Sequence, residues 1–128
     1  ALKSPVSDYL GKIIAQANKY NIKEWKEKGF IYHESSKLGK VKLNYSFFED
    51  AEKISGYKAA KKISIPTFVV HGDKDDAVPV EHSKMLFNIA KEPKKVLIIK
   101  NSDHSFTKKE HLNEVIDKVS EWFLVVFK

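Results

Sequence analysis

The feature that most constrains the fold of this chain is a continuous run of β-branched and aromatic residues, Thr67-Phe-Val-Val-His71. Ile65-Pro66 precedes the run and Gly72 ends it. β-Branched and aromatic residues favour strands, and a run without polar alternation is typical of a strand buried on both faces, as in a parallel sheet. The sequence therefore predicts a central, buried strand at residues 67–71.

The residues after this run predict a helix, a second strand and a second helix. Pro79 stands where the first helix would begin, and Val96–Ile99 predicts another buried strand. The first helix should have an inner face of five apolar residues: Val80, Met85, Leu86, Ile89 and Ala90. A final helix is predicted from about Lys108, with an apolar face made by Leu112, Val115, Ile116, Val119, Trp122 and Phe123. This order is that of a parallel α/β unit, so the predicted fold class is α/β.

The first 62 residues predict only short elements. Helical spacing begins after a cap at Ser7 or Asp8 and involves Leu10, Ile13, Ile14 and Ala17. A second helix, Ile22–Lys28, should be capped by Asn21 and stopped by Gly29. The remaining elements are a hairpin from Phe30–Tyr32 and Val41–Tyr45, followed by short helices at Phe47–Ile54 and Tyr57–Lys62.

Polar residues follow both predicted strands of the second half. Gly72-Asp-Lys-Asp-Asp-Ala-Val-Pro79 comes after the first strand, and Asn101-Ser-Asp-His-Ser-Phe106 comes after the second. Ligands in open parallel sheets bind beyond the carboxyl ends of the strands, so we expect these two loops to lie side by side. A carboxylate beside an imidazole fixes the tautomer of the ring and stabilises its protonated form, as in a nucleophilic triad.

These loops resemble a known family. The segments His71-Gly-Asp-Lys-Asp-Asp-Ala-Val-Pro79 and Asp103-His-Ser-Phe106 look like the C-terminal part of α/β-hydrolase fold enzymes. The similar branches are the serine esterases, the acylglycerol lipases and the prolyl-oligopeptidase-like enzymes. The resemblance covers residues 63–127, and it implies that Asp75 is the acid and His104 the base of a catalytic triad. Asp76 is the alternative acid, and no cofactor is implied.

The resemblance also implies a division of the chain. Residues 1–8 would be the end of a core strand and its loop, residues 9–62 a cap inserted after that strand, and residues 63–128 the C-terminal core. The expected architecture is the C-terminal part of an α/β-hydrolase, with about three parallel strands, flanking helices and a mostly helical cap.

The nucleophile of such an enzyme has no counterpart in this sequence. Its elbow has the pattern Gly-x-Ser-x-Gly, and the five glycines (residues 11, 29, 39, 56 and 72) include no pair four residues apart. Ala1 is not an initiator methionine. We therefore expect a C-terminal fragment of a serine hydrolase acting on carboxylic esters or related acyl substrates, inactive by itself. The alternative is a non-catalytic, degenerate hydrolase-like module that binds a partner.

Composition excludes several other classes. The chain has no cysteine, which excludes disulfides, thiolate metal sites and a cysteine nucleophile. All 23 basic residues are lysines spread along the chain; without arginine, the net charge of +6 predicts a solvated surface rather than a specific nucleic-acid site. The longest apolar run, Trp122–Phe127, is far shorter than the roughly 20 residues of a membrane span. We expect a cytoplasmic protein.

Other candidate residues are predicted to be structural. His71 should pack or hydrogen-bond at the end of its strand, and three histidines should be exposed: His33, His82 and His111. No ligand spacing supports a metal site at His71, Asp73, Asp75 and His104. None of four serines lies on an elbow: Ser4, Ser7, Ser102 and Ser105. The cap aromatics form either an acyl pocket or the core of the cap: Trp25, Phe30, Tyr45, Phe47 and Phe48.

The expected truncation has a consequence for association. Without the preceding strands, the sheet would keep an open edge beside uncovered apolar helix faces, which invites pairing with another chain. We expect a homodimer through that edge, with the N-terminal half and a small ester or acyl substrate as the partners of the intact enzyme.

Overall fold

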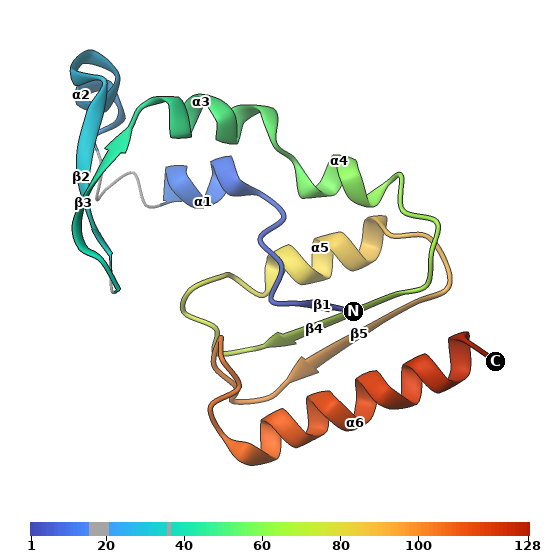
Figure 1. The fold of residues 1–128 in the computed structure, drawn as a ribbon. Coiled ribbons are helices and arrows are strands. Elements are labelled where there is room, and N and C mark those ends of the chain that lie inside the picture. The colour runs from blue at the N-terminus through green and yellow to red at the C-terminus, as the bar shows by residue number, and fades with distance from the viewer. Residues whose placement is uncertain (16–20, 36) are drawn as a thin grey trace. The chain divides into compact units, whose positions relative to one another are not determined.

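The computed structural model describes residues 1–15, 21–35 and 37–128. These residues form two compact units (Figure 1). Ala1–Ser7 and Gly56–Lys128 make the first, here called the core unit, and Asp8–Ser55 make the second, here called the insertion unit. The insertion unit ends at Ser55, earlier than the boundary at residue 62 expected for the cap, and helix α4 (Gly56–Ala60) belongs to the core unit.

The core unit contains a three-stranded parallel sheet. Its strands are β1 (Leu2–Lys3), β4 (Thr67–Gly72) and β5 (Lys94–Ile99), in the order β1-β4-β5. β1 pairs with β4 from Leu2 opposite Val69, and β4 pairs with β5 from Thr67 opposite Lys94. The predicted α/β class with about three parallel strands is confirmed, and β4 is the central strand of this sheet.

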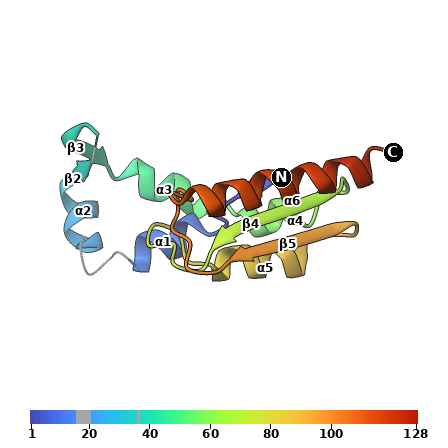
Figure 2. The ribbon, with the colours of Figure 1, turned by 90° about the horizontal axis from the view of Figure 1, so that it is seen from below.

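Helices cover both faces of this sheet (Figures 1 and 2). α4 and α5 (Glu81–Ile89) lie on one side and α6 (Lys109–Val126) on the other. Successive side chains of a strand point to opposite faces. Phe68 and Val70 accordingly pack in the cluster that includes residues of α6, whereas Val69 packs with Leu86 of α5. Every residue of β4 is buried, which explains why apolar side chains at Phe68, Val69 and Val70 point to both faces of the sheet.

The helix after β4 differs from its prediction at Met85, which is 51% exposed rather than on the inner face. The buried residues of α5 are Ser83 and Leu86, followed after the helix by Ala90. Their spacing of three and four residues defines one helical face. Met85 is one residue, or about 100°, away from Leu86, so it lies off that face.

The apolar face of α6 is covered only in part. Val115, Val119 and Trp122 pack against the buried cluster under the sheet. Three neighbours remain exposed, Leu112 at 45%, Ile116 at 53% and Phe123 at 43%. They line an apolar groove together with Leu2, Val70 and Phe106. Within residues 1–15, 21–35 and 37–128, no helix has both the length and the apolar character needed to cross a membrane.

The insertion unit is built from α1 (Tyr9–Ala15), α2 (Ile22–Lys28), β2 (Phe30–Ser35), β3 (Gly39–Asn44) and α3 (Ser46–Lys53). The Asp8 carboxylate accepts the Gly11 N–H at 2.8 Å, so Asp8 rather than Ser7 caps α1. α2 has its predicted bounds, because Asn21 accepts the Glu24 N–H and Gly29 takes φ +74°. The predicted helical position Ala17 lies outside the described residues.

An aromatic cluster forms the core of the insertion unit. Trp25 is 1% exposed and donates its Nε1–H to the carbonyl of Leu43 at 3.1 Å. The rings of Tyr45 and Phe48 stack on each other and meet Trp25 edge-on. These three aromatics are therefore core residues of the insertion unit. Phe30 contacts the ring of Tyr32, and Phe47 is 44% exposed.

Candidate functional site

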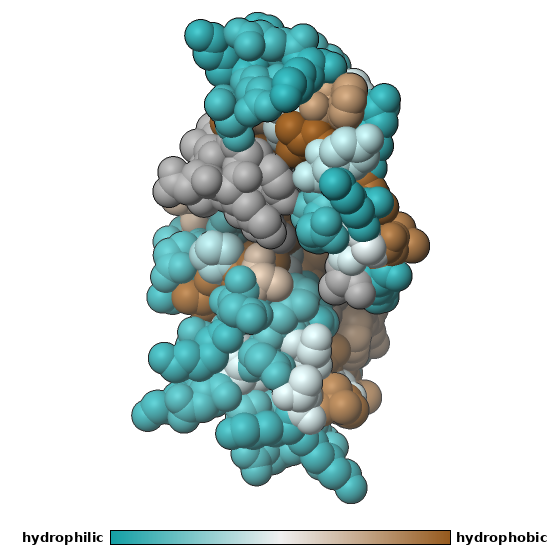
Figure 3. Space-filling model, turned by 90° about the vertical axis from the view of Figure 1, so that its left-hand side faces the viewer, coloured by the Kyte–Doolittle hydropathy of each residue, from teal (hydrophilic) through white to brown (hydrophobic). Residues whose placement is uncertain are grey.

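The two polar loops of the core unit meet at Asp75 and His104. Asp75 follows β4 and His104 follows β5, and parallel pairing places both loops at the same end of the sheet. The Nδ1 of His104 lies 2.8 Å from Oδ2 of Asp75, across 29 residues of sequence. Figure 3 looks onto this end of the core unit, in the lower part of the view, where hydrophilic residues predominate.

The Asp75 carboxylate is buried and strongly hydrogen-bonded. Its side chain has no exposed surface, and its Oδ1 accepts the N–H groups of Ala77 at 2.9 Å and Val78 at 2.8 Å. Burial acts to raise the pKa of Asp75, but the hydrogen bonds from the Val78 N–H, His104 and the Ala77 N–H hold it below its ordinary value. The carboxylate is thus kept charged beside the imidazole.

The contact with Asp75 fixes the tautomer of His104. A charged carboxylate only accepts hydrogen bonds, so the hydrogen of the neutral ring is on Nδ1. Nε2 is then left with its lone pair. The His104 side chain is 37% exposed, and none of the residues that the structure describes hydrogen-bonds to Nε2. This arrangement equips Nε2 to accept a proton from a group outside the core unit.

Two other aspartates shape the loops around this pair. Asp73 accepts the N–H of Asn101 at 2.6 Å and so ties the first loop to the second. Asp103 accepts the N–H groups of Ser105 and Thr107 and the Thr107 hydroxyl, and the Thr107 hydroxyl is the main cause of a lowered pKa at Asp103. Asp76, the alternative acid, is exposed, and the carboxylate at His104 belongs to Asp75.

The close approach of the loops needs a glycine. A Cβ on Gly72 would lie 2.3 Å from the carbonyl oxygen of Ser102 and 2.8 Å from that of Asp103. The His104 loop also holds two non-glycine residues in the left-handed region, Asn101 at φ +57° and Phe106 at φ +54°. Such backbone costs about 1–3 kcal/mol per residue. The buried Phe106 ring, 3% exposed within the cluster beneath the sheet, helps to hold this loop.

His71 is a neighbour of the pair that sequence analysis placed only as a structural residue. Its ring is completely buried, with Nε2 3.0 Å from Oδ2 of Asp75 and 2.9 Å from the carbonyl of Val78. The only signal for this contact in the sequence is the position of His71, at the end of the strand and four residues before Asp75.

Comparison with known proteins classifies the chain. The sequence profile of the prolyl oligopeptidase family matches residues 6–128. The chain belongs to the prolyl oligopeptidase family. Of curated relatives, the uncharacterized peptidase YuxL of Bacillus subtilis (strain 168) is 27% identical over 131 residues, covering 87% of this chain and 19% of that protein. The uncharacterized protein YfhR of Escherichia coli (strain K12) is 37% identical over 54 residues, covering 41% of this chain and 19% of that protein.

Solved structures agree with the α/β-hydrolase fold of this family member. Alpha/beta hydrolase domain-containing protein 10 from mouse superposes with a TM-score of 0.71 and 24% identity, over 92% of this chain and 48% of that one. Est1E from Butyrivibrio proteoclasticus superposes with a TM-score of 0.64 and 27% identity, over 75% and 37%. The chain thus spans about a fifth of the length of the curated relatives and less than half of these structures.

Three histidines that the sequence predicts to be exposed are at least partly buried: His33, His82 and His111. His111 is 8% exposed, because it lies four residues before Val115 and eight before Val119 on the inner face of α6. His82 is half-buried and its Nδ1 accepts the N–H of Ser7 at 3.2 Å. His33 is half-buried on β2.

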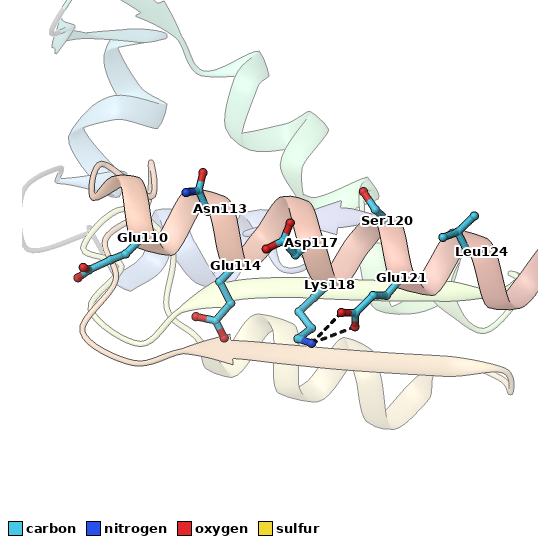
Figure 4. A pocket seen from close by; sticks show the side chains of 8 residues that line it. All are labelled: Glu110, Asn113, Glu114, Asp117, Lys118, Ser120, Glu121 and Leu124. Carbon is cyan, nitrogen blue, oxygen red and sulfur yellow. Dashed lines mark hydrogen bonds and ion pairs between the residues drawn. The ribbon is translucent and has the colours of Figure 1, made fainter.

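Among the described residues, neither the serines nor the polar hollow on α6 forms a second candidate site. Ser4, Ser7 and Ser102 are buried, and their hydroxyls have no hydrogen-bond partner among the described residues, whereas Ser105 is exposed. In the part of the chain that the structure describes, no three His, Asp or Glu residues cluster as metal ligands would. Figure 4 shows the eight side chains that line a hollow along α6; all come from this one helix, and neither Asp75 nor His104 is among them.

Proposed function

We propose that this chain is the C-terminal portion of a serine hydrolase that acts on carboxylic esters or related acyl substrates. In this proposal Asp75 is the acid and His104 the base of a catalytic triad. The observation that carries it is the 2.8 Å contact between Nδ1 of His104 and the buried Asp75 carboxylate, with the opposite side of the ring accessible.

The proposed reaction begins with Nε2 of His104. A serine supplied by the N-terminal part of the intact enzyme attacks the substrate carbonyl, and Nε2 takes the proton from that hydroxyl. Asp75 stabilises the resulting imidazolium through the hydrogen bond to Nδ1. Nε2 then protonates the leaving group as the tetrahedral intermediate collapses to an acyl-enzyme, and water repeats the sequence to release the acid.

The names of the relatives support acyl transfer as the reaction class. One curated relative is described as a peptidase, and two of the similar structures are Est1E, solved with ferulic acid bound, and a monoacylglycerol lipase from Paleococcus ferrophilus. The lipase superposes with a TM-score of 0.54 at 25% identity. A peptidase cleaves an amide, a monoacylglycerol lipase cleaves an ester, and ferulic acid is a carboxylic acid, so the three descriptions together favour esters or related acyl compounds as substrates.

The absence of a Gly-x-Ser-x-Gly elbow from the sequence favours a chain that is inactive by itself. We expect the 128-residue chain to show no hydrolysis of p-nitrophenyl esters. Turnover that disappears in His104→Ala would contradict this expectation.

The proposal is tested on the complete product of the gene. An in-frame elbow encoded upstream of Ala1 is expected, and the complete protein should hydrolyse short p-nitrophenyl esters. His104→Ala and Asp75→Asn should each lower kcat by about 10³–10⁴-fold. Asp76→Asn is the matched control, because Asp76 is the adjacent aspartate and is exposed.

Each outcome of this test has a separate meaning. Loss of activity in Asp76→Asn but not in Asp75→Asn would reverse the assignment of the acid. A complete gene product that has no elbow and hydrolyses no ester would favour the second candidate, a degenerate hydrolase-like module that binds a partner.

A further inference from the structure

We propose that His71 is a positioning residue that holds the Asp75 carboxylate in the orientation that meets His104. Only the expected effect on kcat rests on the proposed function. The positioning itself is a property of this chain and can be measured without turnover.

The contacts of the His71 ring are all within the buried part of the core unit. Nε2 lies 2.9 Å from the carbonyl oxygen of Val78 and 3.0 Å from Oδ2 of Asp75, and Nδ1 lies 2.6 Å from the hydroxyl of Ser83. His71 and Ser83 each have 0% exposure. Both side chains are shielded from bulk solvent, so these hydrogen bonds are made within the protein.

The hydrogen on Nε2 of His71 is fixed by its neighbours. A backbone carbonyl and a carboxylate are both acceptors, so the nitrogen between them carries the hydrogen. The Nε2–H of His71 therefore donates to the Val78 carbonyl, and Oδ2 of Asp75 lies 3.0 Å from the same nitrogen. Ser83, on the inner face of α5, holds the ring at its other nitrogen.

This arrangement places Oδ2 of Asp75 between two imidazoles. His104 contacts it at 2.8 Å from the solvent side, and His71 contacts it at 3.0 Å from the interior. Val78 donates its N–H to Oδ1 of the same carboxylate and accepts from His71. His71 thus holds the Val78 end of the turn that surrounds the Asp75 carboxylate. Through its hydrogen bond with Ser83, it also connects α5 to Asp75 and His104.

Glutamine, asparagine and leucine at position 71 separate positioning from simple packing. A glutamine amide nitrogen reaches about where Nε2 of histidine lies, an asparagine amide reaches only about as far as Nδ1, and leucine fills the space without a donor. The readout in the 128-residue chain is the tautomer of His104, from ¹⁵N–¹H NMR of its ring. The wild-type chain should show the hydrogen on Nδ1 of His104, slowly exchanging.

His71→Gln is expected to keep this signature, whereas His71→Asn and His71→Leu are expected to lose it, with thermal unfolding showing that the variants are folded. If the leucine variant does not fold, the glutamine and asparagine variants decide, because both are polar. Any other pattern of these two, including both keeping or both losing the signature, would overturn the proposal.

Activity of the complete gene product provides the second readout. His71→Asn should lower kcat by about 10–100-fold with KM unchanged, as expected when a catalytic group is misplaced, and His71→Gln should restore most of it. Failure of the proposed function would appear differently, as a wild-type protein without Asp75-dependent hydrolysis. If all three His71 variants keep the wild-type kcat while Asp75→Asn is inactive, the positioning role of His71 is refuted and the proposed function stands.

Discussion

The core unit and the insertion unit pair their strands in opposite ways, and only one of them brings distant polar residues together. In the core unit, parallel pairing sets Thr67 of β4 opposite Lys94 of β5, with a helix between them in sequence. In the insertion unit, the antiparallel hairpin of β2 and β3 pairs Ser35 with Gly39. Parallel strands end at the same edge of a sheet, so the loops after them meet, whereas a hairpin joins residues that are already neighbours.

The two units also differ in what their cores contain. Among the described residues of the insertion unit, the buried core is a cluster around Trp25 and Phe48. The core unit has apolar clusters on both faces of its sheet and, beside them, the buried polar residues His71 and Ser83. Buried polar groups are stable only when their hydrogen bonds are made. The hydrogen bonds of His71 and Ser83 therefore fix the orientation of both side chains beside Asp75, which apolar packing alone would not do.

The largest effect is expected from Trp25→Ala, which tests whether the two units are independent. Loss of this side chain, 1% exposed, should destabilise the insertion unit by about 3–5 kcal/mol. The Nδ1–H signal of His104 should be unchanged by NMR, and Leu38→Ala, at 77% exposure, is the control. Simultaneous loss of the His104 signal would mean that the core unit depends on the insertion unit.

Two glycines, one in each unit, should respond to alanine for different reasons. Gly72→Ala forces a Cβ against the Ser102 carbonyl and should cost about 3 kcal/mol and disturb the His104 signal. Gly39→Ala has open space but φ +65°, and should cost about 1–2 kcal/mol with the site intact. Urea unfolding and NMR measure both. Equal effects on the His104 signal would show that the loop approach at Gly72 is not what positions the site.

The open edge of the core unit is predicted to pair with a second copy of this chain. Within the described residues no strand pairs with the outer side of β1, and the apolar groove beside it includes Ile116. We propose that the groove and this edge form the interface of a dimer. Ile116→Glu should weaken the dimer at least tenfold in sedimentation equilibrium, since burying such a side chain contributes about 1.5–3 kcal/mol.

Met85→Glu is the matched control for the dimer. Met85 is 51% exposed, like Ile116 at 53%, but lies on α5 outside the groove, and its substitution should leave the dimer intact. A wild-type chain that sediments as a monomer at tens of micromolar, or equal effects of the two substitutions, would argue against this interface.

The smallest effect concerns the acid sensitivity of the core unit at Asp103. Hydrogen bonds from Thr107 lower the pKa of this carboxyl in the folded state. The stabilisation is therefore complete above the unfolded-state pKa of about 3.9 and is lost as the pH falls through the lower folded-state value. Asp103→Asn should slightly lower the urea midpoint at pH 6, and the difference from the wild type should shrink below pH 3. A difference independent of pH would point to packing instead of charge.

The sequence predicted the elements of the core unit better than the details of its site. β4 ends only one residue later than expected and α6 begins only one residue after its expected start, because a buried strand and an amphipathic helix have patterns that extend over many residues. Met85 was placed on the wrong face and His111 was expected at the surface. Each depends on which residues face the sheet, which a hydrophobic pattern determines only to within about one residue of rotation.

The sequence by itself determined that carboxylates follow one buried strand and that a histidine follows the next. Because parallel strands end at a common edge of the sheet, it also determined that the two loops would meet. It also determined, by the spacing of its glycines, that no nucleophile elbow is present. Only the tertiary structure decided that the Asp75 carboxylate, among three nearby aspartates, meets His104, and that His71 lies behind it. Those contacts depend on strand register and on loop backbone angles, which are set by packing between residues far apart in the chain.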